Sequence, residues 1–178
     1  MVLTAVRDYA ETGLTIREAM IDHAKRYPNK TERPDHIHWA GLRVKTSDVF
    51  HVPQNGVVRA EFLSAKDDVE QGFDIQFDDG WVELEKGEHI SHLRTWKDTK
   101  FDDVVEYPFF CRDGRLWVWN VYKMKYRGGQ IVEEKWTENA GFWVEQISEN
   151  ERIYHCSHGM ATPPDFDSLV FKVLIVPQ

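Results

Sequence analysis

Residues 117–142 read WVWNVYKMKYRGGQIVEEKWTENAGF, two runs rich in aromatic and β-branched residues on either side of Gly128-Gly129. Two adjacent glycines between such runs are typical of a β-hairpin, because a tight turn needs positive φ angles at its centre. With Arg127 opposite Gln130, the numbers of paired residues sum to 257. The stretch therefore predicts a long two-stranded antiparallel ribbon.

This register decides which side chains share one face of the ribbon, because side chains alternate along a strand. An arginine and a glutamate among indoles suit a ligand pocket in which Arg115 anchors an anion and Glu138 donates or accepts a proton. The alternative is an outside face with both charges solvated. A register shifted by one residue would place the two charges on opposite faces. The predicted face carries Arg115, Trp117, Trp119, Val121, Trp136, Glu138 and Phe142.

The length and composition of the chain restrict its class. Its 178 residues fit a single domain, residues 1–178, with enough apolar content for a sizeable core. A net charge of −8 without a dense basic patch argues against nucleic acid and anionic membranes as partners. No apolar run approaches the roughly 20 residues that cross a bilayer, and the start lacks a signal-peptide pattern, so we expect a cytoplasmic protein. Cys111 and Cys156 lack disulfide or zinc spacing and are expected as free, buried thiols.

The first 35 residues are predicted to be a helical segment that packs on the rest of the chain. Thr15 and Glu18 have the spacing of a capping box, and apolar residues recur at helical spacing from Ile16 to Tyr27. A second, short helix is predicted over Val2–Glu11.

Residues 36–178 are predicted to form antiparallel strands separated by Gly-, Asn- and Asp-rich turns. Many meandering strands favour a closed barrel or a two-layered sandwich, because both remove exposed edges. A small barrel of eight to ten strands is the preferred fold. The candidate strands are Ile37–Lys45, Val57–Ser64, Phe73–Phe77, Trp81–Glu85, His89–Lys97, Val104–Cys111, Leu116–Tyr126, Ile131–Thr137, Gly141–Ile147, Arg152–His158 and Leu169–Val176.

Histidines offer a second kind of site. His36 and His38 alternate on one predicted strand, as in metal-binding jelly rolls of the cupin kind, although no glutamate follows at the spacing that such a site needs. His155 and Cys156 are neighbours and point to opposite faces of their strand, so His155 cannot readily activate the thiol. His155 is retained as a side chain that lines a cavity.

Four segments together resemble a known family. They are Phe77–Trp81, Gly114-Arg115, Trp136–Gly141 and Ser148–His155, and their order along residues 73–155 is similar to that of the phenolic acid decarboxylases. Members of that family are small calycin-type, lipocalin-like β-barrels that remove carbon dioxide from hydroxycinnamic acids without a cofactor. The resemblance implies Arg115 and Glu138 as the catalytic pair. The family's paired tyrosines correspond to Ile75 and Phe77, which leaves Tyr107, Tyr122 and Tyr154 as candidate hydroxyl donors.

The sequence thus predicts a calycin-like barrel that binds a small aromatic or apolar acid or carbonyl compound and acts as a cofactor-free lyase or isomerase. The alternatives are a non-catalytic carrier of a hydrophobic ligand and a metal-dependent enzyme built on His36 and His38. A homodimer is compatible with the sequence. Besides the catalytic pair, the predicted ligand contacts are Trp117, Trp119, Trp136, Phe142, Tyr122 and His155.

Overall fold

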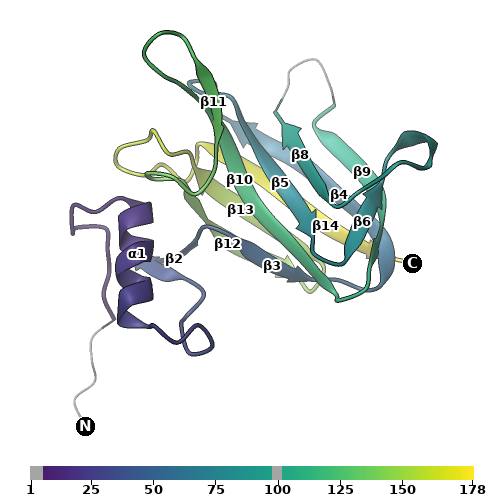
Figure 1. The fold of residues 1–178 in the computed structure, drawn as a ribbon, viewed down its shortest axis with the longest axis horizontal. Coiled ribbons are helices and arrows are strands. Elements are labelled where there is room, and N and C mark those ends of the chain that lie inside the picture. Colours follow the sequence, from purple (N-terminus) through teal and green to yellow (C-terminus); the bar gives the residue numbers. More distant parts are fainter. Residues whose placement is uncertain (1–5, 98–101) are drawn as a thin grey trace.

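A computed structural model describes residues 6–97 and 102–178 of the chain. These residues form two antiparallel β-sheets and one α-helix, α1 (Ile16–Arg26), which stands beside the sheets next to β2 (Figure 1). A 3₁₀ turn, η1, covers Glu85–Gly87. The prediction of a mainly antiparallel β fold is confirmed.

The larger sheet has nine strands in the order β1-β2-β12-β13-β14-β4-β9-β6-β7. Its most extensive pairing joins the C-terminal strand β14 to β4, in the interior of the sheet. The bounds are β1 Ile37–Trp39, β2 Leu42–Lys45, β4 Asn55–Ala65, β6 Gly80–Glu83, β7 His89–Ile90, β9 Val104–Cys111, β12 Gly141–Ser148, β13 Glu151–Ser157 and β14 Leu169–Pro177.

The smaller sheet runs in the order β11-β10-β5-β8, and β3 pairs with the first half of β10. Strand β10 is its long central strand, as the aromatic run at Trp117 predicted. The bounds are β3 Asp48–His51, β5 Gln71–Phe77, β8 His92–Trp96, β10 Arg115–Lys125 and β11 Ile131–Glu134.

The preference for a closed barrel was wrong for the part of the chain that the structure describes. Its strands lie in two separate sheets, and the ends of the hydrogen-bonded order do not meet. The large sheet ends at β1 and β7, whereas the small one ends at β11 and β8. Apolar inner faces can therefore be covered by stacking two layers, which is the sandwich alternative.

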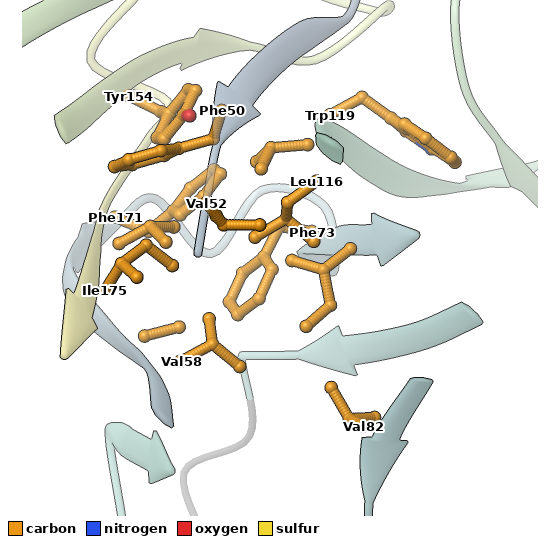
Figure 2. Close-up of a cluster of buried hydrophobic side chains, with 14 of the residues drawn as sticks. Phe50, Val52, Val58, Phe73, Val82, Leu116, Trp119, Tyr154, Phe171 and Ile175 are labelled. Atoms are coloured by element: carbon orange, nitrogen blue, oxygen red, sulfur yellow. The ribbon is translucent and has the colours of Figure 1, made fainter. Parts of the chain in front are cut away.

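The core between the two sheets centres on a series of aromatic rings. Phe73 of β5 stacks on Phe171 of β14 with ring centroids 4.6 Å apart, and Phe171 stacks on Tyr154 of β13 at 4.9 Å. Phe142 of β12 meets Tyr154 edge-on at 5.4 Å. Figure 2 shows this cluster with aliphatic side chains such as Ile175 packed around it. One ring column thus joins the small sheet to three strands of the large sheet.

Helix α1 begins as the sequence predicted, with Thr15 and Glu18 forming a complete capping box. Two further N–H groups of its first turn are bound from outside the helix, because Arg17 N donates to the Glu138 carbonyl and Ile16 N to Asn139 Oδ1. The helix is therefore attached to the connection between β11 and β12. The described part of the predicted short helix, Val6–Glu11, is not helical, and residues 2–5 lie outside the described residues.

The hairpin of β10 and β11 has a different register from the predicted one. Tyr122 pairs with Glu134 and Lys125 with Ile131, so the paired numbers sum to 256 instead of 257. Tyr126 N donates to the Gln130 carbonyl, which leaves a three-residue loop where a two-residue turn was expected. The register prediction was wrong by one residue, although the glycine signal was correct: both glycines have positive φ.

Two other expectations can be compared with the structure. Cys111 and Cys156 are free and buried, as predicted, and burial raises the pKa of the Cys156 thiol well above its usual value. Cys156 is thus a packing residue. No helix in the two described stretches has both the length and the apolar character needed to cross a bilayer.

We expect Phe171→Ala to lower the free energy of unfolding by about 3–5 kcal/mol, because the ring is completely buried between Phe73 and Tyr154. Urea unfolding followed by tryptophan fluorescence measures this. Val176→Ala on the same strand is the control, since Val176 is exposed and its truncation should cost less than about 1 kcal/mol. Equal losses for both variants would contradict the role of the ring column.

Candidate functional site

Asp48, on β3, is a buried carboxylate that connects the small sheet to the large one. Its Oδ2 accepts hydrogen bonds from Tyr154 Oη and from Arg152 Nη1, both at 2.8 Å, and its Oδ1 accepts from Lys45 Nζ at 2.9 Å. The donors belong to β13 and β2 of the large sheet. A buried carboxylate is tolerated only when such donors replace its water shell, so Asp48 fixes where β3 lies against β2 and β13.

The partners of Asp48 are polarised by it. Burial opposes the charge on Lys45, but the carboxylates of Asp48 and Asp35 outweigh burial and raise the pKa of Lys45, which stays protonated. Burial and the Asp48 carboxylate raise the pKa of the Tyr154 phenol well above its usual value, so this hydroxyl remains a donor. The guanidinium of Arg152 also lies over the ring of Phe50, 4.4 Å from its centroid. The network is thus cationic at its outer end.

A groove of about 370 Å³ opens over this network. Its volume lies within the range of small-molecule sites. The lining holds three permanent cations and two imidazoles against two carboxylates, in a chain whose net charge is −8. No carboxylate of residues 6–97 or 102–178 pairs with Arg43 or His51. The lining residues are Asp35, His36, Arg43, Lys45, Asp48, Val49, His51, Val144, Gln146 and Arg152.

A second concavity of about 250 Å³ lies between α1 and β1 and shares the side chain of His36 with the groove. Its lining is more apolar and includes Tyr9, Tyr27 and Ile37. The Asp22 carboxylate orients its polar rim, because it accepts a hydrogen bond from Tyr9 Oη at 2.7 Å. Burial, followed by this bond, raises the pKa of Tyr9 to about 12. An aromatic pocket therefore adjoins a cationic groove.

Arg115 and Glu138, the predicted catalytic pair, lie in different surroundings. Arg115 is exposed at the start of β10, with its Nε 3.4 Å from Asp113 Oδ2. Glu138 is exposed in the connection between β11 and β12, where its backbone carbonyl binds the start of α1. Strand β11 ends at Glu134 and does not continue to residue 138. The structure does not bring the two charges together.

The tryptophans predicted to line a pocket lie on the outer face of the small sheet. Trp117 is half-buried and donates from Nε1 to Asp78 Oδ2 at 2.9 Å. Trp119 is buried, with its ring 5.2 Å from that of Trp136. Figure 2 shows Trp119 extending away from Phe73 and the other core side chains. Two of the three indoles are thus brought together, on the face opposite the core.

The other predicted ligand contacts have structural partners. Phe142 is completely buried in the ring column. Tyr122 is buried, with its hydroxyl 2.6 Å from Thr137 Oγ1. His155 stacks on Trp143 at 4.0 Å and pairs with Glu145 at 2.9 Å. None of these three side chains lines the groove over Asp48.

His36 and His38, the alternative metal ligands, are neighbours as predicted, with ring centroids 5.1 Å apart. His36 Nδ1 lies 2.7 Å from Asp35 Oδ1. Both histidines line the aromatic pocket, and His36 also lines the groove. Within the described residues, no group of three or more His, Cys, Asp or Glu side chains is arranged to hold a metal ion.

The sequence analysis missed Asp48, Lys45 and Arg152 as a site. Strand β3 was left out of the predicted strands, because its four residues are too short to show a convincing alternation. A local signal did exist, since Asp48 and Phe50 alternate with Val49 and His51. The pairing of Asp48 with Arg152 and Tyr154 spans more than 100 residues and leaves no local trace.

Comparison of the chain with protein-family models, with curated proteins and with solved structures gave no match. The resemblance to the phenolic acid decarboxylases therefore stays a prediction from short motifs. Function has to be argued from the side chains of the site.

We expect Asp48→Asn to lower the free energy of unfolding by about 2–4 kcal/mol, because it leaves two partly buried cations without their shared carboxylate. Asp35→Asn is the matched control: Asp35 pairs with the same Lys45 but is exposed, so its loss should cost less than about 1 kcal/mol. Urea unfolding of both variants measures the difference. An Asp48→Asn protein as stable as the Asp35→Asn protein would rule out the proposed structural role.

Proposed function

We propose that this protein binds a small organic carboxylate in the groove over Asp48. The observation that carries the proposal is the convergence of Arg43, Lys45, Arg152 and two imidazoles on one concave surface of an otherwise acidic protein. Arginine offers a planar fork of donors that suits a carboxylate, and a concave lining strengthens the local potential.

The adjoining pocket suggests the rest of the ligand. His36 belongs to both linings, so a molecule with its acid group in the groove would direct its body towards Tyr9 and Tyr27. Most ligand sites combine an apolar wall with a few placed polar groups. An aromatic or apolar acid, the class expected from the sequence, fits this combination better than a small inorganic anion does.

We expect Arg43→Ala to weaken binding of 4-hydroxycinnamate about tenfold or more, the effect of losing one charge-assisted contact of about 1.5–3 kcal/mol. Arg43 is exposed, so its truncation should leave the fold intact. Isothermal titration at low ionic strength measures the dissociation constant. Arg112→Ala is the control, because Arg112 is an equally exposed arginine that pairs with Asp79 outside the groove. Equal binding by wild type and Arg43→Ala would refute the groove as the site.

The aromatic pocket has its own test. Acetate and 4-hydroxycinnamate carry the same charge, so any tighter binding of the aromatic acid reports the pocket rather than the cations. Tyr27→Ala should abolish this difference and leave the affinity for acetate unchanged, since Tyr27 lines the pocket and not the groove.

A cofactor-free lyase or isomerase reaction of calycin type, with Arg115 and Glu138 as the catalytic pair, is our second proposal. Its support is the ordered series of motifs from Phe77 to His155 together with the antiparallel β architecture. Decarboxylation of 4-hydroxycinnamate would replace its carboxyl group by a proton and release 4-vinylphenol and carbon dioxide.

Chromatography of 4-hydroxycinnamate incubated with the protein tests this reaction. If Glu138 supplies the proton, 4-vinylphenol forms with wild type, and Glu138→Gln lowers the rate by about 10²-fold or more. Binding without product would leave the carrier function and remove the lyase. Full turnover by Glu138→Gln would remove Glu138 from the reaction.

A further inference from the structure

The outer face of the small sheet carries two indoles around one lysine. The rings of Trp119 and Trp136 lie 5.2 Å apart and are inclined at 55°. The Nζ of Lys135 stands 4.4 Å from the centroid of Trp136 and 5.0 Å from that of Trp119. We call these two indoles, with His92 against Trp119 at 5.7 Å, the aromatic cage. A cation within about 6 Å of an indole face is attracted by the ring quadrupole.

The backbone of the cage is held in an unfavourable conformation. Trp136 has φ 57° and Glu138 has φ 49°, both in the left-handed region. A bulky residue rarely adopts this region, and each such residue costs about 1–3 kcal/mol. The strain ends β11 and places the Trp136 ring over Trp119, although Trp136 itself is 42% exposed. Little apolar burial of Trp136 offsets this cost.

The cage also contains a polar group without a partner. Trp119 is 3% exposed, and its Nε1 is buried without a hydrogen-bond acceptor among the described residues. A buried donor of this kind normally finds an acceptor, so its isolation marks a site that the chain alone does not complete. The surrounding segment is acidic, because Glu133, Glu134 and Glu138 flank Lys135. An acidic surround favours a cation as the missing occupant.

We propose that the aromatic cage is a binding site for a methylated ammonium group, with Lys135 as its intramolecular occupant. No carboxylate in residues 6–97 or 102–178 pairs with Lys135, so the indoles are its principal attraction. A quaternary ammonium is less strongly hydrated than a lysine ammonium and gains more from aromatic faces. It would displace the Lys135 side chain towards solvent. The site is separate from the groove over Asp48 and does not depend on the function proposed for it.

Choline is the probe, and the indole N–H signals of Trp119 and Trp136 in ¹⁵N–¹H NMR spectra are the readout. Wild type should bind choline weakly with shifts of both signals. Lys135→Ala should bind choline about tenfold more tightly, because it removes a competing cation–π contact of about 1–2 kcal/mol. Lys135→Ala/Trp136→Ala should not bind it. Equal choline affinity in wild type and Lys135→Ala, or no shift in either protein, would overturn the proposal.

Two controls separate the cage from weaker explanations. Lys123 stands over the single indole of Trp96 at 4.7 Å, so Lys123→Ala removes a comparable cation–π pair outside the cage and should leave choline affinity unchanged. 3,3-Dimethylbutan-1-ol has the shape of choline without its charge and should not bind. Tight binding of this alcohol would show an apolar site and would refute cation recognition.

Discussion

The hydrogen bond between Tyr154 Oη and Asp48 Oδ2 joins the packed core to the charged groove. Tyr154 is the last ring of the column that starts at Phe73, so its position is set by the stacking of the two sheets. Asp48 is buried and needs several donors to replace water, and these come from the other sheet. The constraint therefore places Lys45 and Arg152 side by side at the edge of the sandwich, where their remaining donors face solvent.

Local charge, rather than net charge, decides what such a surface attracts. The acidic balance of the chain correctly argues against polyanionic partners, yet the groove concentrates cations on a small concave area. On the outer face of the small sheet the arrangement is reversed: an acidic segment surrounds two indoles and a lysine. The molecule thus presents one site suited to an anion and one suited to a cation, with different elements supporting each.

The one-residue difference in the β10–β11 register explains why the predicted pocket is not the observed one. A slip of one residue exchanges the faces of every side chain on a strand. The three-residue loop at Gly128-Gly129 changes the pairing, and the left-handed residues Trp136 and Glu138 then end the strand. Neither effect has a clear signature in the sequence, because non-glycine residues rarely adopt positive φ. Arg115 and Glu138 consequently belong to separate surfaces.

The sequence by itself determined what local interactions control. The capping box at Thr15, the alternation of the long strands, the turn at Gly128-Gly129 and the buried thiols all depend on neighbours within a few residues. Only the tertiary structure decided the rest: two open sheets instead of a barrel, the brief strand β3, and the Asp48 network. The reason is physical, since edge pairing and the burial of a charge are settled by partners more than 100 residues away, whose proximity no local pattern encodes.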